Sequence, residues 1–188
     1  HRGGVGAGAR PGDGAGILTQ IPAALFADDL ARNGAAGLGQ GEFAVAMLFL
    51  PQDAATAASA RQELASTLAE RGLELIGWRE APVDPSVLGH IAAATQPVIE
   101  QALIRRPANA DPDEFERTLM LARRAIERAW LAAGIDGANV VSMSARTIIY
   151  KGFCLPEDLA AFYADLRDPR YESAIALFHQ RYSTNTLP

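Results

Sequence analysis

The sequence predicts an α+β fold, in which helices pack against an antiparallel sheet. Three observations indicate this fold class. Residues 43–50 form a nearly continuous apolar run, and residues 111–134 contain apolar positions that repeat every three to four residues. Glycine or proline stands at most boundaries between the short segments. With 188 residues, 49% apolar and 21% charged, the chain is long enough to bury one substantial core.

The first quarter of the chain contains two strand candidates. Residues 17–21 predict a short strand that ends at Pro22, and residues 23–31 predict a short helix. A glycine-rich connection, residues 33–41, leads to the apolar run of residues 43–50. This run is typical of a buried strand.

A helix and a further strand follow. Asp53 has the side chain of an N-cap residue, and Gly72 stands where a helix commonly ends in a left-handed glycine. Residues 73–79 then predict a strand. The helix between Asp53 and Gly72 has one apolar face, made of Ala57, Ala60, Leu64 and Leu68.

The middle of the chain predicts a short helix at residues 87–94, a strand at 97–104 and the longest helix. Asp111 is the expected N-cap of this long helix, with proline at its first position, and Gly134 ends it. Its apolar face consists of Phe115, Leu119, Ala122, Ile126 and Trp130.

The last third predicts two strands, residues 140–144 and 147–152, that form a hairpin turning near residues 145–146. Short helices are expected to begin at Pro156 and at Asp168.

Residues 43–143 thus follow the order β-α-β-α-β-α-β with a short middle helix, close to the β-α-β-β-α-β order of ferredoxin-like modules. We expect one antiparallel sheet with two helices on one face, as a possible ferredoxin-like insertion at 43–143. Its predicted core is Val45, Leu48, Leu64, Leu68, Ile76, Ile99, Leu119, Ile126 and Val141.

Composition and charge exclude several classes of protein. A net charge of −5 argues against a nucleic-acid binder, which normally carries a basic excess. One cysteine excludes an internal disulfide and a thiolate metal cluster. No apolar run approaches the ~20 residues of a membrane span, and no signal peptide is visible, so we expect a cytoplasmic protein without a membrane partner. Lys151 is the only lysine, and the arginine- and alanine-rich composition suggests a GC-rich bacterial genome.

The glycine-rich start does not fit a phosphate-binding loop. No strand precedes Gly4, and no Gly-Lys-Ser/Thr follows. We expect these glycines to allow tight turns and close backbone approach, with Asp13 capping local N–H groups rather than transferring protons. Residues 17–21 should form an inner strand of the main sheet, and the turn at Gly14 should lie near Arg181.

Cysteine and histidine give no clear catalytic or metal site. Cys154 lies between apolar neighbours and is interpreted as a small buried side chain rather than a nucleophile. His90 and His179 are far apart and lack the spacing with acidic residues that metal sites show, so no metal is expected.

The C-terminal run, residues 179–186, reads His-Gln-Arg-Tyr-Ser-Thr-Asn-Thr. A guanidinium followed by hydroxyl and amide groups suits a bound carboxylate, because arginine pairs with it in a bidentate way. The same residues also suit the end of a strand and a solvated turn. Chemistry alone leaves both interpretations open.

Several motifs, in order along the chain, resemble one family. They are His-Arg-Gly-Gly at 1–4, Gly-Asp-Gly-Ala-Gly at 12–16, Gly-Trp-Arg at 77–79, the segment 144–152, Asp-Leu-Arg-Asp-Pro-Arg at 165–170, and the run 179–186. Over essentially all 188 residues the sequence resembles the glutaminase domain of the glutamate synthase large subunit, a class II glutamine amidotransferase. Because it begins at His1 and ends directly after a motif, we expect an excerpt from a longer protein, a partial amidotransferase domain over 1–188.

The resemblance implies an N-terminal-nucleophile hydrolase fold, a four-layer αββα sandwich of which this chain is part. In the family an N-terminal cysteine, with its own α-amine as base, attacks the glutamine side-chain amide. Ammonia leaves, and the thioester is hydrolysed to glutamate. The implied parent passes ammonia to the reductive amination of 2-oxoglutarate, with FMN and iron–sulfur clusters. Its implied partners are glutamine, the remaining synthase domains, and a reductase subunit or ferredoxin as electron donor.

The resemblance assigns substrate-binding roles to four residues. Arg181 matches the arginine that pairs with the glutamine α-carboxylate, Thr184 a neighbouring pocket residue, Asn185 a weaker neighbour, and Arg2 an arginine near the nucleophile. The family's nucleophilic cysteine stands before the His-Arg-Gly motif, and its Asn-Gly-Glu oxyanion segment stands after the Ser-Thr-Asn-Thr motif. Neither lies in these 188 residues, so no catalytic residue is assigned and the chain alone is expected to be inactive.

Two alternatives stay open from the sequence. The first is a non-catalytic α+β module that binds an amino acid or a regulatory partner. The second is a divergent, catalytically inactive homologue.

Overall fold

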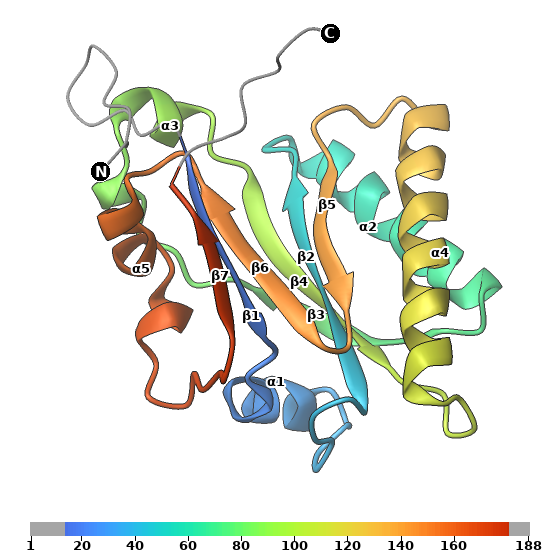
Figure 1. Ribbon diagram of the computed structural model, residues 1–188. Helices are drawn as coiled ribbons and strands as arrows, with labels where there is room; N and C mark the ends of the chain where they lie inside the picture. Colours follow the sequence, from blue (N-terminus) through green and yellow to red (C-terminus); the bar gives the residue numbers. More distant parts are fainter. Residues whose placement is uncertain (1–13, 181–188) are drawn as a thin grey trace, which may run out of the picture.

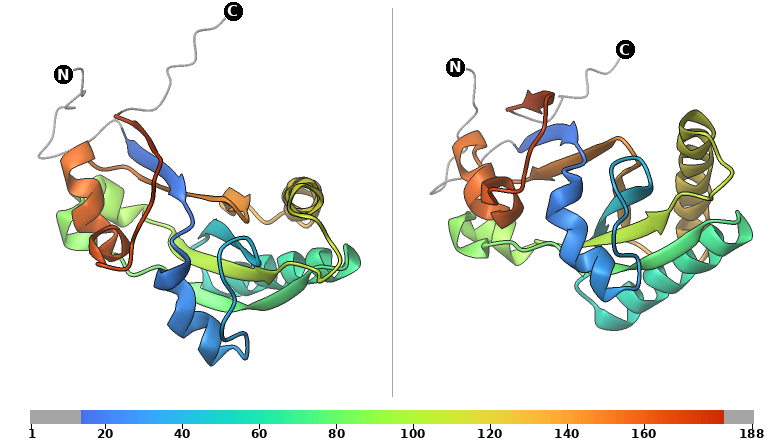
Figure 2. Two further views of the ribbon diagram at one scale, coloured as in Figure 1. Left: turned by 60° about the horizontal axis from the view of Figure 1, so that its bottom comes forward. Right: turned by 90° about the horizontal axis from the view of Figure 1, so that it is seen from below.

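Two antiparallel sheets packed face to face form the centre of the molecule, as the computed structural model shows for residues 14–180 (Figure 1). The larger sheet has the order β3-β4-β2-β5 and the smaller one β6-β1-β7. Helices α2 and α4 cover the outer face of the larger sheet (Figure 2). The predicted α+β class is therefore confirmed. The fourth layer of an αββα sandwich stays a prediction.

The larger sheet consists of β2 (Phe43–Leu50), β3 (Glu74–Glu80), β4 (Val98–Arg105) and β5 (Asn139–Ser144). All neighbouring strands are antiparallel. Helix α2 (Ala54–Glu70) connects β2 to β3, with β4 lying between them, and α4 (Pro112–Ala132) connects β4 to β5, with β2 between. Each β-α-β unit is thus split by a strand of the other unit, which is the predicted arrangement of this segment. Whether it is an insertion stays a prediction.

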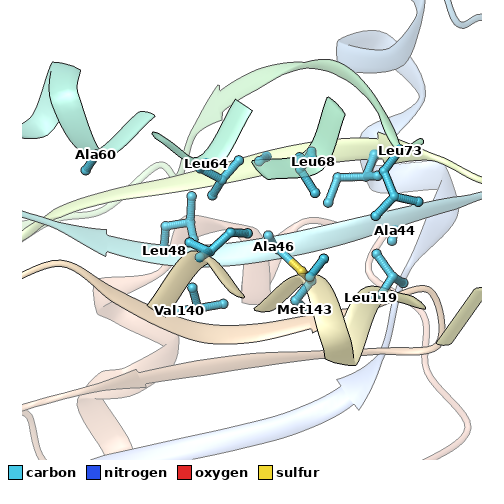
Figure 3. Close-up of a cluster of buried hydrophobic side chains, with 14 of the residues drawn as sticks. Ala44, Ala46, Leu48, Ala60, Leu64, Leu68, Leu73, Leu119, Val140 and Met143 are labelled. Carbon is cyan, nitrogen blue, oxygen red and sulfur yellow. The ribbon is translucent and has the colours of Figure 1, made fainter. Parts of the chain in front are cut away.

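Both long helices begin and end as the sequence predicts. The Asp53 carboxylate accepts a hydrogen bond from the Thr56 backbone N–H at 2.8 Å, and the Asp111 carboxylate accepts from the Asp113 and Glu114 N–H groups. Gly72 and Gly134 follow the helices with φ angles of 69° and 66°. Their apolar faces pack on one face of the sheet, around Ala44, Ala46, Leu48, Leu64, Leu68, Leu119, Val140 and Met143 (Figure 3).

Strand β2 is buried on both faces, which explains its continuous apolar run. Ala44, Ala46 and Leu48 face the helices, whereas Val45 and Met47 face the smaller sheet. The predicted core of residues 43–143 is buried, except that Ile76 is partly buried. It is divided between two clusters, however. Leu48, Leu64, Leu68, Leu119 and Ile126 contact the helix layer, while Val45, Ile76, Ile99 and Val141 contribute to the core between the sheets.

The smaller sheet places β1 (Ala15–Gln20) between β6 (Thr147–Gly152) and β7 (Ala176–His179). The strand predicted at residues 17–21 is therefore an inner strand, as expected, but it belongs to the smaller sheet rather than to the larger one. A 3-10 turn and α1 (Ala27–Arg32) follow it, as expected for residues 23–31. Helix α5 (Leu159–Phe162) adds Leu159 and Phe162 to the core between the sheets.

The predicted hairpin of residues 140–152 is wrong, although both strands exist. Strand β5 pairs with β2, and β6 pairs with β1 in the other sheet. The N–H groups of the connection are bound by side chains instead of by a facing strand. The Glu116 carboxylate accepts from the Ala145 N–H at 2.6 Å, and the Ser144 hydroxyl accepts from the Arg146 and Thr147 N–H groups. The chain therefore crosses from one sheet to the other.

Two short helices also differ from expectation. No helix begins at Asp168 within residues 14–180, because the Asp168 carboxylate binds the Arg170 N–H and guanidinium and closes a local turn. A 3-10 turn, Ala164–Arg167, precedes it instead. The helix expected at 87–94 is shorter: only α3 (His90–Ala94) is helical, after a 3-10 turn at Pro85–Val87.

Helix α4 offers a matched test of the packing. Leu119 is fully buried and Leu121, two residues away, is 52% exposed. We expect Leu119→Ala to lower the free energy of unfolding by roughly 2–5 kcal/mol, because it leaves a cavity as well as losing apolar burial. Leu121→Ala should change it by less than about 0.5 kcal/mol. Urea unfolding of both variants measures the difference, and equal losses would contradict the described packing.

Candidate functional site

The two ends of the described chain meet at one end of the smaller sheet (Figure 1). Strands β1 and β7 are antiparallel, and Gly16 pairs with His179. Gly14 and Gln180, the first and last described residues, therefore lie at the same end of this sheet. Gly14 lies in the 12–16 motif, ten residues after the motif that contains Arg2, and Gln180 directly precedes Arg181.

The predicted substrate-binding residues themselves, Arg2, Arg181, Thr184 and Asn185, lie outside the described residues. So does Asp13. Their proposed roles, and the expected proximity of the Gly14 turn to Arg181, stay predictions.

Gly16 of β1 stands between Lys151 of β6 and His179 of β7. A Cβ atom at this position would stand 2.4 Å from Cε1 of His179 and 3.0 Å from the Cβ of Lys151. Both distances are shorter than ordinary van der Waals contact, so any side chain here would displace the imidazole. The expectation that a glycine permits close approach near the start of the chain is confirmed at Gly16.

A buried network of hydrogen bonds around Arg79 of β3 connects the larger sheet to the smaller one. The Arg79 guanidinium donates to the Asp165 carboxylate at 2.8 Å and 2.7 Å, to Asp29 at 3.0 Å and to the Gln101 side-chain oxygen at 2.7 Å. Its central carbon lies 5.4 Å from the centre of the Phe26 ring. The Asp165 side chain is only 2% exposed, so this bidentate pair is removed from water.

Tyr150 of β6 completes the network. Its hydroxyl donates to Asp165 at 2.8 Å and accepts from the Gln101 amide at 3.2 Å. Burial, together with the Asp165 carboxylate, raises the pKa of Tyr150 well above its ordinary value, so the phenol stays a donor. Burial by itself would lower the pKa of Arg79, but Asp165 and Asp29 raise it above the ordinary value. The arginine is therefore a permanent cation between two carboxylates.

The network unites two motifs that are 86 residues apart, Gly-Trp-Arg at 77–79 and the Asp165–Arg170 segment. Neither spacing nor motif predicts a role for Arg79, Asp165, Gln101 or Tyr150. A signal was present in the strand at residues 98–105, where Gln101 is the one uncharged polar residue and directly precedes the apolar run 102–104. A polar side chain at a core position implies buried hydrogen-bond partners.

Cys154 is buried, as expected, and does not have the environment of a nucleophile. Burial, with a contribution from the Asp158 carboxylate, raises the pKa of its thiol to about 11. Reactive cysteines have lowered pKa values and stand near cations or helix N-termini. Among residues 14–180, no three side chains of histidine, cysteine, aspartate or glutamate gather as metal ligands would.

We therefore expect Cys154 to resist thiol reagents in the folded protein. With a pKa of about 11, only about one thiol in a thousand is ionised at pH 8, and the sulfur is also shielded from solvent. Titration of the 188-residue chain with a disulfide reagent should show slow reaction in buffer and rapid reaction in denaturant. Rapid modification without denaturant would contradict the described burial.

Comparison with known proteins gives a family match over the whole sequence. The model of the family described as "Glutamine amidotransferases class-II" matches residues 1–188. The chain is 41% identical over 189 residues to "Ferredoxin-dependent glutamate synthase, chloroplastic" of Oryza sativa. It is 40% identical over 189 residues to "Glutamate synthase [NADPH] large chain" of Azospirillum brasilense, and 36% identical over 190 residues to the protein of the same name from Bacillus subtilis.

Each of these matches covers 100% of this chain but only 12% of the relative's length. The relatives come from plants as well as bacteria, so they do not support the bacterial origin suggested by composition. The plant protein is named as chloroplastic, and a cytoplasmic location for this chain stays a prediction. Within residues 14–180, no helix has the length and apolarity needed to cross a bilayer.

Proposed function

Because the chain belongs to the class II glutamine amidotransferases, we propose that it forms the glutamine-binding part of the glutaminase region of a glutamate synthase. In the proposed reaction, the side-chain amide of glutamine is hydrolysed to glutamate and ammonia. The ammonia then serves the reductive amination of 2-oxoglutarate elsewhere in the full-length protein. This chain's own contribution is to bind and orient glutamine.

One observation carries the proposal: the pairing of β1 with β7, which brings Gly14 and Gln180 to the same end of the smaller sheet, with Arg181 directly after Gln180. Arg181 is the second residue after the end of β7, and Arg2 stands 13 residues before the start of β1, in the glycine-rich segment. In the proposed site, Arg181 pairs with the α-carboxylate of glutamine as a bidentate donor, and Thr184, Asn185 and Arg2 complete the pocket. The Arg79 network supports the sheets from which both ends emerge.

The proposed chemistry needs an ionisable nucleophile with an adjacent base, and donors for the oxyanion. Cys154 does not supply this nucleophile, because its thiol is buried and protonated. In the family's mechanism the nucleophile is an N-terminal cysteine, which is not among these 188 residues. An iron–sulfur cluster requires several thiolate ligands, and one buried cysteine does not fit that requirement. We propose that FMN, iron–sulfur clusters and the electron donor, a reductase subunit or ferredoxin, are bound by other parts of the full-length protein.

Glutamine hydrolysis tests the proposal. We expect the full-length protein to release ammonia from glutamine, and a Cys154→Ala variant to retain that rate within about twofold, since a buried protonated thiol takes no part. The 188-residue chain alone should release no ammonia above background. A full-length protein that does not hydrolyse glutamine would contradict the proposal. Loss of activity in Cys154→Ala, with unchanged thermal unfolding, would contradict the assignment of the nucleophile.

A further inference from the structure

The last residue of β7, His179, lies against a position of β1 that has no side chain. A Cβ atom on Gly16 would stand 2.4 Å from Cε1 and 3.1 Å from Nε2 of the imidazole. Carbon atoms that are not bonded to each other normally stay about 3.5 Å or more apart. The imidazole therefore occupies the space in which a side chain at residue 16 would lie.

This contact joins two motifs that are far apart in the sequence. Gly16 ends the Gly-Asp-Gly-Ala-Gly motif at 12–16, and His179 begins the run 179–186, which contains Arg181. Two residues of chain span at most about 7 Å, so a shift of the backbone at His179 is passed on to Arg181. A glycine in the first motif thus makes room for the histidine of the second.

Side chains also hold the segment before β7 on β1. The Tyr171 and Thr19 hydroxyls share a hydrogen bond of 2.6 Å, and the Ala174 N–H donates to the side-chain oxygen of Gln20 at 3.0 Å. These two contacts fix the chain at the start of β7, at the end of the smaller sheet that is farther from Arg181.

The other end of β7 has little packing to hold it. All four residues of the strand are exposed, Leu177 to 69% and Phe178 to 68%. Besides the backbone pairing of β7 with β1, the contact of the His179 ring with Gly16 fixes this end. It lies two residues before Arg181, the proposed partner of the substrate carboxylate.

We propose that His179 is a positioning residue for glutamine binding. Its imidazole, which lies on Gly16, fixes the end of β7 and hence the point from which Arg181 reaches the α-carboxylate of glutamine. Gly16 has the complementary role, because only a residue without a side chain leaves room for the ring. This inference rests on the proposed function, since it assigns a role within the same glutamine site.

Steady-state kinetics of the full-length protein, with glutamine and with free ammonia, test the proposal. We expect His179→Ala to raise the KM for glutamine at least about fivefold with little change in kcat, because the carboxylate partner is misplaced in both the ground state and the transition state. Gly16→Ala should have a similar effect, since the added methyl group displaces the ring. Glutamate synthesis from ammonia should stay near normal in both variants, because ammonia does not use the glutamine site.

The double variant Gly16→Ala/His179→Ala tests whether the two residues act through their contact. Without the ring, the methyl group meets the Cβ atom of Lys151 at 3.0 Å, which requires only a small adjustment. The KM of the double variant should therefore match that of His179→Ala, whereas independent effects would multiply. Leu177→Ala is a matched control, because it removes an exposed side chain from the same strand, and it should leave the KM unchanged.

An unchanged KM for glutamine in His179→Ala would overturn the proposal. Equal losses with glutamine and with ammonia would also overturn it, because they would make the role of His179 merely structural, and so would multiplied effects in the double variant. His179→Ala removes an exposed side chain, and thermal unfolding checks that it stays folded. If the unaltered full-length protein hydrolyses glutamine and His179→Ala behaves in the same way, only this inference fails; if the unaltered protein does not hydrolyse glutamine, the proposed function fails.

Discussion

Replacing Arg79 with methionine is expected to lower the free energy of unfolding by about 3–5 kcal/mol, the range for breaking a buried ion pair from one side. Methionine keeps much of the apolar stem but leaves the Asp165 and Asp29 carboxylates without their cation. The Gln101 oxygen also loses its donor. Urea unfolding followed by circular dichroism measures the loss.

Arg32 offers a matched control, because it also pairs with Asp29 but its side chain is 69% exposed. Arg32→Met should cost at most about 1 kcal/mol, as exposed ion pairs contribute little. In the double variant Arg79→Met/Asp165→Asn, the loss should be smaller than the sum of the two single losses, because the two residues are one interacting pair. If Arg79→Met costs no more than Arg32→Met, the network does not have the stabilising role described here.

The largest functional effect is expected from Arg181→Lys in the full-length protein. Lysine keeps the charge but loses the planar bidentate geometry that matches a carboxylate. We expect the KM for glutamine to rise at least tenfold, which corresponds to about 1.4 kcal/mol of lost binding. Synthesis of glutamate from free ammonia should stay near normal, since ammonia does not use the glutamine site. Steady-state kinetics with each nitrogen donor measures both values.

The comparison between the two nitrogen donors separates binding from folding. If ammonia-dependent synthesis falls as far as glutamine-dependent synthesis, Arg181 is a structural residue and its assigned role is wrong. Arg167→Lys is a suitable control. Arg167 lies in the 3-10 turn at 164–167, and its guanidinium makes one long hydrogen bond, to the Ala161 carbonyl at 3.5 Å. It should leave the KM for glutamine unchanged.

Local signals in the sequence were enough to predict most elements of the fold. The caps Asp53 and Asp111, the C-terminal glycines and the apolar period of α4 are short-range features, and each determines a helix boundary through its nearest neighbours. The apolar run of β2 indicated burial. It did not reveal that the two faces pack against different layers, because that depends on which sheet lies opposite.

The errors arose where long-range pairing overrides local pattern. Two strands joined by a two-residue turn normally pair with each other, but Ser144 and the distant Glu116 direct β5 and β6 into different sheets. Strand β7 was not predicted, because all four of its residues are exposed and it has no alternation of buried side chains. The Arg79 network escaped detection since its members lie up to 136 positions apart, Asp29 to Asp165, and only the fold brings them together.

The central claim is that the two motif-bearing ends of this chain form one pocket for the α-carboxylate of glutamine. A crystal structure of the full-length protein with bound glutamine tests it most directly. We predict that the Arg181 guanidinium lies about 2.7–2.9 Å from both carboxylate oxygens, at the end of the smaller sheet where Gly16 pairs with His179. Glutamine bound at another place, with Arg181 and Gly14 on opposite sides of the molecule, would contradict the account.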